Sequence, residues 1–424
     1  MKKLTYIFAG FIGVYVLMNI ISLQGVVYTH TEEMNQYSEY RSKYARPVNE
    51  WEKPNIDNGI YYEEMQALPK IARDTKENPY TEAKMLLGKK LFFEPKLSKS
   101  GQIACASCHN PELAFGDSVR TSFGHDRQRG KRNAPNIMMS GFFDELFWDG
   151  RAKGLESQAL MPIVNPIEMA HELVAMQNYI AKTQEYYPLF LLAFGVSESQ
   201  YEILRIQSKD EAVRRKEFDR ILLDLLKADR QNKNLDSILQ SQALTKEQIL
   251  AAKKLITQEN IAKAIATYER SIVPKNTRFN RFLNGDYKVL SNQEIYGLHI
   301  FRTKGRCMNC HYGVALSDGK FHNIGLSFYG RKLEDLGRYE VTKDEKDLGA
   351  FKTPSLIAVS KSAPYMHNGI FPTLQGVIHM YNAGFPTQTI RQTSKAVPKT
   401  SELIQPLKLN KEEMEALEAF LLTL

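Results

Sequence analysis

Two copies of one five-residue pattern hold every cysteine of this chain, and they constrain it more than any other feature. The copies span Cys105–His109 and Cys307–His311, and each has the form Cys-x-x-Cys-His. This form is the attachment signature of a c-type haem. Two thiols about one turn apart can add to the two vinyl groups on one edge of a porphyrin, and the histidine that follows then binds the iron. The pattern predicts two covalently bound haems, attached through Cys105, Cys108, Cys307 and Cys310, with His109 and His311 as axial ligands.

Other uses of paired cysteines fit this pattern less well. A thioredoxin-like Cys-x-x-Cys does not need the following histidine. A zinc site would require the two motifs to meet in space, and it would leave two histidines without a role. A disulfide framework would not explain the five-residue pattern. With all four cysteines used for haem, no thiol remains for a structural disulfide.

The composition indicates a globular protein with enough chain for two domains of ordinary size. The 424 residues are 43% apolar and 25% charged, without low-complexity bias. The formal charge of +8 omits the haem propionates, which would add about four negative charges for two haems. No run of lysine and arginine with interleaved aromatic residues occurs, so the basic balance does not predict nucleic-acid binding.

The first 28 residues indicate export. Met1-Lys2-Lys3 precedes a largely apolar stretch from Leu4 to Tyr28, and a positive start before an apolar run is typical of a secretory signal. No clear small-residue cleavage site follows, and the stretch approaches the ~20 residues that span a bilayer. A cleaved signal peptide and a retained inner-membrane anchor therefore both stay open. Either one would place the rest of the chain in the periplasm, where c-type haem is attached.

Apolar residues recur at helical spacing along the rest of the chain, and we expect an all-α fold. The two haem motifs divide it into two haem domains with long loops. Residues 29–80 are polar and aromatic, which predicts a tether. Residues 81–257 are expected to form an N-terminal haem domain, with a charged and exposed helical insertion near 196–250. Residues 258–424 are expected to form a C-terminal haem domain, closed by an amphipathic helix over 411–423.

The helices expected ahead of the two haem motifs resemble each other. Residues 83–93 and 296–301 both place a leucine and a phenylalanine shortly before Cys-x-x-Cys-His, which suggests an internal duplication of the haem domain. Further helices are expected over 170–195 and 251–270.

Five further blocks surround the haem motifs, and together they resemble the bacterial dihaem cytochrome c peroxidase and MauG family. The resembling stretches run from about residue 83 to 170 and from about 258 to 385. The resemblance implies two mostly helical cytochrome c-like domains that meet at a calcium site. In chain order the blocks are Leu86–Phe92, Lys131–Pro135, Phe147–Ala152, Asn165–Met169 and Ala363–Gly369.

For the N-terminal haem, the resemblance implies the site of peroxide reduction. Cleavage of the O–O bond needs a group above the iron that moves a proton from one oxygen to the other. Glu168 matches the family's catalytic carboxylate, and Gln158 is expected beside it. His125, sixteen residues after His109, matches the histidine that closes this haem in resting peroxidases and leaves when the other haem is reduced. A histidine in a surface loop is the alternative.

The resemblance also assigns residues between the two haems. Trp148 matches a tryptophan that would assist electron transfer from one haem to the other. Asn133 matches the side-chain ligand of the calcium ion, and Ser362 and Pro364 match the positions that give backbone carbonyl ligands. Serine at position 362 replaces a commoner threonine, which does not matter for a carbonyl ligand. One Ca²⁺ is therefore expected in addition to the two haems.

Opposite His311, the sequence departs from the peroxidase pattern. Peroxidases carry an axial methionine twelve residues after the glycine that matches Gly369, and here that position is Tyr381. It matches the tyrosine ligand of MauG-like members. Met380 is adjacent and Met366 is also near, so a methionine ligand stays open. Methionine raises the potential of a haem, whereas an anionic tyrosine oxygen should lower it; we favour Tyr381.

Three functions are compatible with these residues. The favoured one is a peroxidase that reduces hydrogen peroxide with electrons from a small cytochrome or similar donor. The second is a MauG-like enzyme that uses peroxide to oxidise a partner; Tyr381 supports it, and a ligating His125 argues against it. The third is an electron carrier without peroxide chemistry, which Glu168 and Gln158 argue against because a carrier needs no distal acid. Homodimer formation and membrane anchoring through residues 4–28 stay open.

Overall fold

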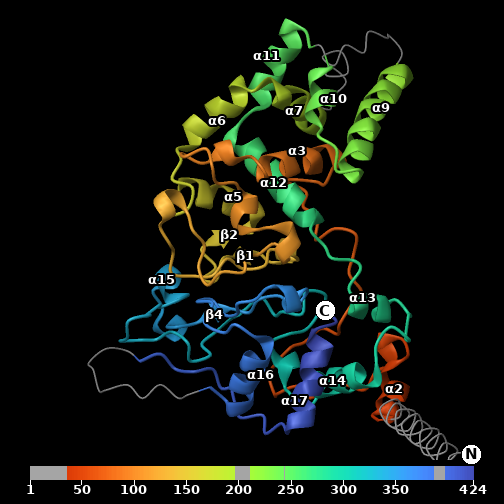
Figure 1. Cartoon of the computed structure of the whole chain (residues 1–424), viewed down its shortest axis with the longest axis vertical. Coiled ribbons are helices and arrows are strands. Elements are labelled where there is room, and N and C mark those ends of the chain that lie inside the picture. Colours follow the sequence, from red (N-terminus) through yellow and green to blue (C-terminus); the bar gives the residue numbers. More distant parts are fainter. Residues whose placement is uncertain (1–35, 196–210, 243, 386–396) are drawn as a thin grey trace, which may run out of the picture.

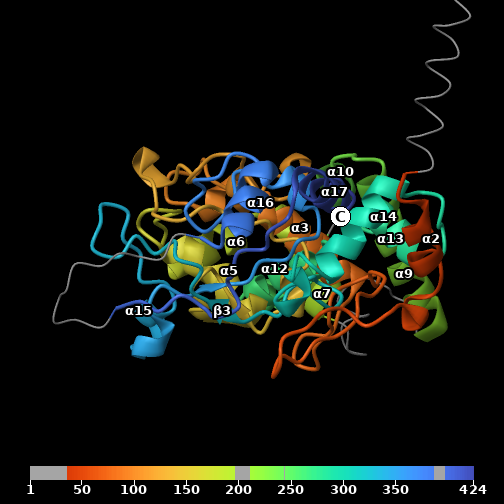
Figure 2. The same cartoon turned by 90° about the horizontal axis from the view of Figure 1, so that it is seen from below.

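The computed structural model describes residues 36–195, 211–242, 244–385 and 397–424. Figure 1 shows two helical bodies stacked along the long axis of the molecule, with the first body at the top; Figure 2 shows the same arrangement from below. Within those ranges no helix is both long and apolar enough to cross a membrane. The export segment predicted over 4–28 lies outside the described residues.

Helices dominate both bodies, as predicted, and the strands among the described residues form two short antiparallel pairs. In the pairs, Glu145 lies opposite Lys153, and Phe321 lies opposite Lys352. The strands are β1 (Glu145–Leu146), β2 (Ala152–Lys153), β3 (Phe321–His322) and β4 (Phe351–Lys352). The helices of the first body are α3 (Glu82–Phe92), α4 (Cys105–Cys108), α5 (Gly154–Val164), α6 (Leu173–Lys182), α7 (Tyr187–Phe194), α9 (Glu211–Arg230), α10 (Asp236–Gln240), α11 (Lys246–Leu255) and α12 (Gln258–Ser271). The helices of the second body are α2 (Ser38–Tyr44), α13 (Arg278–Leu283), α14 (Asn292–Arg302), α15 (Tyr339–Thr342), α16 (Leu374–Ala383) and α17 (Lys411–Leu421).

The first body is built on the crossing of α3 and α12. Thr81 and Thr257 cap the N-termini of these helices through their side-chain hydroxyls, which satisfies backbone N–H groups that lack a helical partner. At the crossing, a Cβ atom on Gly88 would lie 1.9 Å from the carbonyl oxygen of Ala264. Glycine therefore allows the two backbones to approach. The buried residues around the crossing include Leu86, Leu87, Leu91, Phe92, Ile261, Ile265 and Tyr268.

The second body repeats this arrangement with α14 and α17. Ser291 and Asn410 begin the two helices with capping boxes. A Cβ atom on Gly297 would lie 1.8 Å from the carbonyl oxygen of Ala416. The buried residues around this crossing include Leu298, Phe301, Leu417 and Phe420. The equivalent glycine in each crossing supports the predicted internal duplication.

Residues 36–68 of the segment predicted as a tether are packed onto the second body. We call residues 36–68 the belt. Its side chains Tyr44, Trp51 and Met65 are buried in the second core. The prediction of a tether was wrong here because isolated aromatic anchors and charged pairs hold the belt, and neither produces an apolar helical period.

Two other predicted boundaries also differ from the structure. Helix α12 packs into the first core, so the first body ends after Ser271 instead of at residue 257. The predicted exposed insertion has one face packed in its described residues, 211–242 and 244–250, where Leu225 and Leu239 are buried in the same core. Side-chain periodicity identifies an apolar helix face but does not identify the partner that covers it.

Candidate functional site

The histidine of each haem motif is held in a fixed orientation by a backbone carbonyl. The Nδ1 atom of His109 lies 3.0 Å from the carbonyl oxygen of Phe115, and Nδ1 of His311 lies 2.9 Å from that of Leu316. A carbonyl oxygen only accepts hydrogen bonds, so Nδ1 carries the proton and the lone pair is on Nε2. Burial lowers the pKa of both histidines. Each is therefore a neutral imidazole with Nε2 available to a metal, as in oriented metal-ligand histidines.

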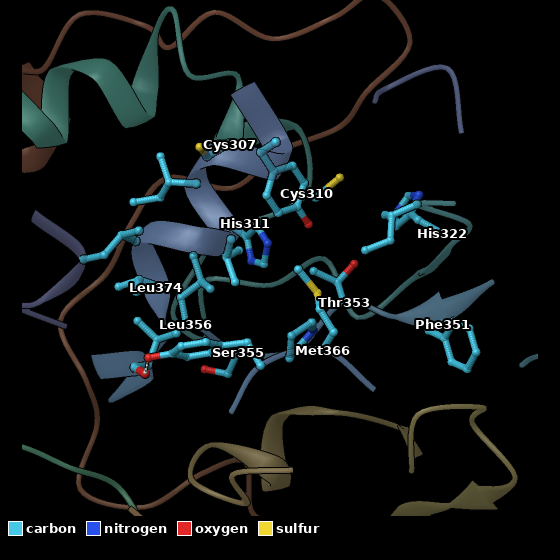
Figure 3. A pocket seen from close by; sticks show the side chains of 18 of the residues that line it. Cys307, Cys310, His311, His322, Phe351, Thr353, Ser355, Leu356, Met366 and Leu374 are labelled. Carbon is cyan, nitrogen blue, oxygen red and sulfur yellow. Dashed lines mark hydrogen bonds between the residues drawn. The ribbon is translucent and has the colours of Figure 1, made fainter. Parts of the chain in front are cut away.

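Each motif opens onto its own cavity. The first cavity has about 1020 Å³ of free space, part of it open to solvent, and is lined by Cys105, Cys108 and His109. The second has about 1660 Å³ and is lined by Cys307, Cys310 and His311, with apolar walls that include Leu356 and Leu374 (Figure 3). Paired thiols, an oriented imidazole and mainly apolar walls fit a covalently attached haem in each cavity, and separate cavities exclude one zinc site shared by the two motifs.

The first cavity contains the predicted catalytic carboxylate and the glutamine expected beside it. Glu168 and Gln158 both line it, Gln158 from α5 and Glu168 from the loop that follows. The Asn165 amide donates to Oε1 of Glu168 at 2.8 Å. Burial raises the pKa of Glu168, against the opposing charge of Arg151 and the hydrogen bond from Asn165. A raised pKa makes this carboxyl group a better proton carrier than an exposed glutamate.

His125 lies beside this loop, but its side chain is not part of the cavity wall. The backbone N–H of His125 donates to the carbonyl oxygens of Ile167 (3.0 Å) and Glu168 (2.8 Å). Its Nδ1 is buried without a hydrogen-bond partner, and its Nε2 lies 3.5 Å from a carboxylate oxygen of Asp126. The loop continues with positive φ at Asp126 (52°) and Arg127 (57°), a backbone conformation that costs energy in residues other than glycine.

Trp148 lies at the boundary between the two bodies and lines both cavities. Its indole N–H donates to the carbonyl oxygen of Asn133 at 2.9 Å. Its own carbonyl oxygen accepts from the backbone N–H of Lys352 in the second body at 2.8 Å. The predicted calcium residues Asn133, Ser362 and Pro364 share the wall of the second cavity.

Charged side chains that sequence reasoning missed join the two bodies near Trp148. Arg132, which lines the first cavity, donates to both carboxylate oxygens of Asp335 in the second body at 2.8 Å and to Asp149 at 2.5 Å. Arg338 of the second body donates to Glu145 at 2.7 Å. No local pattern could have identified these pairs, because the partners are far apart in the chain.

His367 is a second feature of this boundary that the sequence did not reveal. Its ring stacks on Phe351 with 3.5 Å between the centroids, and it meets the ring of Trp148 edge-on at 6.4 Å. Burial lowers the pKa of His367 to about 3, so the ring is a neutral spacer. The block Ala363–Gly369, which the resemblance singled out, contains this histidine.

The structure distinguishes between the candidate second ligands of the C-terminal haem. Tyr381, from α16, and Met366 both line the second cavity, whereas Met380 does not. Figure 3 shows Met366 extending into the same space as His311. Burial raises the pKa of Tyr381, and the neighbouring Cys310 and Cys307 add to this effect.

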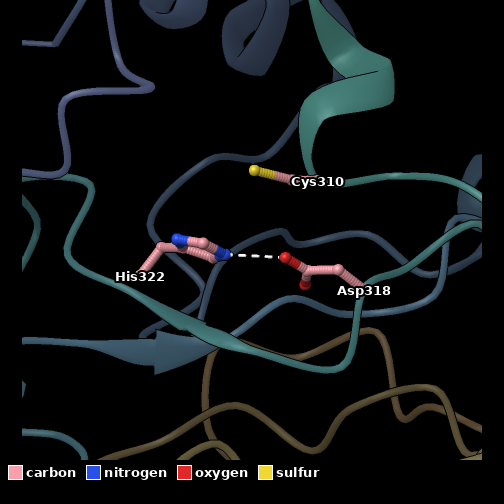
Figure 4. Close-up of side chains that lie close together, drawn as sticks. All are labelled: Cys310, Asp318 and His322. Carbon is pink, nitrogen blue, oxygen red and sulfur yellow. Dashed lines mark hydrogen bonds and ion pairs between the residues drawn. The ribbon is translucent and has the colours of Figure 1, made fainter. Parts of the chain in front are cut away.

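One group of potential metal ligands is found among the described residues, and it consists of Cys310, Asp318 and His322 (Figure 4). Nε2 of His322 lies 2.8 Å from a carboxylate oxygen of Asp318. Burial disfavours the charged form of His322, but the hydrogen bond with Asp318 raises its pKa. In a haem thioether Cys310 offers no thiolate, so this group belongs to the haem cavity.

Each of the two bodies is built on a pair of crossing helices, and in each a Cys-x-x-Cys-His motif lines a separate cavity. This arrangement defines a two-domain c-type cytochrome. The family model for di-haem cytochrome c peroxidase matches residues 82–224 and 206–288. The chain is 31% identical to cytochrome c551 peroxidase of Nitrosomonas europaea over 69% of this chain and 70% of that protein. It is 30% identical to the methylamine utilization protein MauG of Methylophilus methylotrophus over 72% of this chain and 74% of that protein.

Among solved structures, a MauG-like protein associated with microbial copper homeostasis matches with a TM-score of 0.64 and 25% identity, over 86% of this chain and 95% of that one. The chain belongs to the di-haem cytochrome c peroxidase family, which also includes MauG. The family implies two haem cofactors, in agreement with the two motifs.

Proposed function

We propose that this chain reduces hydrogen peroxide to water at the N-terminal haem, using electrons that enter at the C-terminal haem from a small cytochrome or similar donor. The observation that carries the proposal is the partly buried carboxyl group of Glu168 in the same cavity as His109 and the first pair of cysteines. An electron carrier has no use for an acid–base group at this place.

The haem attached at Cys105 and Cys108 supplies, when bound, the iron that binds peroxide and passes electrons to it. Glu168 accepts a proton from one peroxide oxygen and delivers it to the other, so that the departing oxygen leaves as water. The amide of Gln158 orients the peroxide in the cavity. Arg151 stacks on Phe147 at 3.5 Å and limits how far the pKa of Glu168 rises.

Trp148 supports the proposed transfer between the two haems because it lines both cavities. Hydrogen bonds to Asn133 and from Lys352 tie its indole and its backbone to both bodies. We also propose that Ca²⁺ binds the side-chain oxygen of Asn133 and the carbonyl oxygens of Ser362 and Pro364, since oxygen ligands of this kind suit the ion. The charged start and apolar run at the N-terminus support a periplasmic location.

A MauG-like oxidation of a partner is the second candidate, and two observations favour it. Tyr381 lines the second cavity, and His125 stays outside the wall of the first. In the peroxidase, by contrast, His125 would close the N-terminal haem until the other haem is reduced. The spin state of the N-terminal iron in the fully oxidised protein separates the two: six-coordinate low spin supports the gate, and high spin supports the MauG-like enzyme.

The Glu168→Gln variant tests the proposed function. We expect peroxide-dependent oxidation of a reduced small cytochrome to fall by roughly 10²–10⁴-fold, the usual contribution of an acid–base group, with both haems still attached. Glu172→Gln is a matched control, because it removes an exposed carboxylate four residues further along. Wild-type turnover by Glu168→Gln would show that Glu168 is not the proton carrier.

A further inference from the structure

A second carboxyl group lies in the first cavity, and the proposed mechanism does not use it. Ile265 and Glu269 are four residues apart on α12, so they lie on one face of the helix, and both line this cavity. Glu269 is only 6% exposed. A carboxyl group is seldom buried to this extent unless it is paired.

Glu269 has no hydrogen-bond partner for its carboxyl group among the described residues. The neighbouring Arg270 donates to both carboxylate oxygens of Glu156, at 2.7 and 3.0 Å, so its guanidinium is already engaged. Burial raises the pKa of Glu269 to about 8, with Arg270 opposing and Glu156 adding to the shift. Its charge also acts on Tyr268 of α12 and, before haem is attached, on the thiol of Cys105 of α4. Glu269 is thus a largely buried carboxyl group with a raised pKa in the cavity that holds a haem-attachment cysteine.

The protonation of a buried carboxyl group depends on charge that develops near it. Positive charge that develops nearby stabilises the carboxylate and favours release of the proton, whereas an added electron favours its return. Reduction of peroxide to two water molecules takes up two electrons and two protons, and Glu168 only relays a proton that peroxide already carries. The protons taken up must therefore come from other groups or from solvent.

We propose that Glu269 is a proton-carrying group of the N-terminal haem cavity, which releases its proton when positive charge develops there and takes one up when an electron arrives. The proposal rests on the proposed function, since that function is what changes the charge in the cavity. Glu269 acts through its proton and its charge, and touches neither peroxide nor the iron.

The test is a potentiometric titration of the holoprotein between about pH 6 and about pH 9.5, with the two haems distinguished by optical and EPR spectra. In the wild type, the midpoint potential of the N-terminal haem should fall as pH rises, by up to about 59 mV per pH unit for one proton per electron. At the acidic end of the range, the midpoint potential of Glu269→Gln should equal that of the wild type. As pH rises, the potential of this variant should fall less steeply, because the contribution of Glu269 is missing. Glu269→Asp, which keeps a carboxyl group, should retain the slope.

Glu259→Gln is the matched control, because it removes an exposed carboxylate from the same helix and should leave the slope unchanged. Equal slopes in the wild type and Glu269→Gln would overturn the proposal. If Glu269→Gln attaches haem poorly, Glu269→Asp carries the test: a shift of the pH range over which the potential falls would support the proposal, and a curve identical to that of the wild type would overturn it. The titration does not depend on turnover, so a failure of peroxide reduction in the wild type would count against the proposed function alone.

Discussion

Removal of Glu64 from the belt should destabilise the second body strongly. Arg302 of α14 is fully buried, and its guanidinium donates to both carboxylate oxygens of Glu64, at 2.5 and 2.9 Å. It also donates to the carbonyl oxygen of Glu52 at 2.7 Å. Loss of one partner of a buried ion pair costs about 3–5 kcal/mol. Because Glu64 is partly exposed and the Glu52 carbonyl remains, we expect Glu64→Gln to cost about 3 kcal/mol.

The free energy of unfolding can be measured with urea and tryptophan fluorescence. The chain has two tryptophans, so a Trp148→Phe background leaves Trp51 of the belt as the reporter. Glu63→Gln is the matched control, because Glu63 is exposed and adjacent. A cost below about 0.5 kcal/mol, the usual size of a surface substitution, would refute the conclusion that this pair anchors the belt.

Two further predictions follow from the helix crossings and from the second cavity. Gly88→Ala and Gly297→Ala should each destabilise their own body by at least about 2 kcal/mol, because the added Cβ meets a backbone carbonyl that cannot rotate away; thermal unfolding that stays at the wild-type midpoint would contradict this. Tyr381→Met should raise the midpoint potential of the C-terminal haem, because methionine ligation favours the reduced iron; an unchanged potential in a redox titration would remove Tyr381 as the ligand.

The haem motifs and the similar helices ahead of them could be predicted from the sequence because their signals are local. Cys-x-x-Cys-His is a five-residue pattern, and the helices before it show apolar spacing. The boundary at residue 257 was wrong because the apolar face of α12 fits either body, and only the three-dimensional structure shows that α3 covers it. The prediction of a tether was wrong over the belt for a similar reason. Residues that anchor the belt, such as Trp51 and Glu64, contact partners more than two hundred residues away in the chain.

Residues of the site could be predicted where they lie in a sequence motif, and residues outside such motifs could not. Glu168 and Trp148 lie in blocks that resemble the family, and the structure places both on the walls of the first cavity. Glu269 is not distinguished in sequence from a solvated glutamate on an amphipathic helix, since its burial depends on α12 lying against that cavity. Arg132 is also not distinguished by a local pattern, because its carboxylate partners come from both bodies.

The most direct test of peroxide reduction at the N-terminal haem is a peroxide titration of the purified dihaem protein, oxidised and half-reduced. Optical and EPR spectra would be recorded alongside oxidation of a reduced small cytochrome. We predict that half-reduction produces a high-spin N-terminal haem and that cytochrome oxidation then follows peroxide addition. Absence of any reaction with peroxide in both states would contradict the account and leave the chain as an electron carrier.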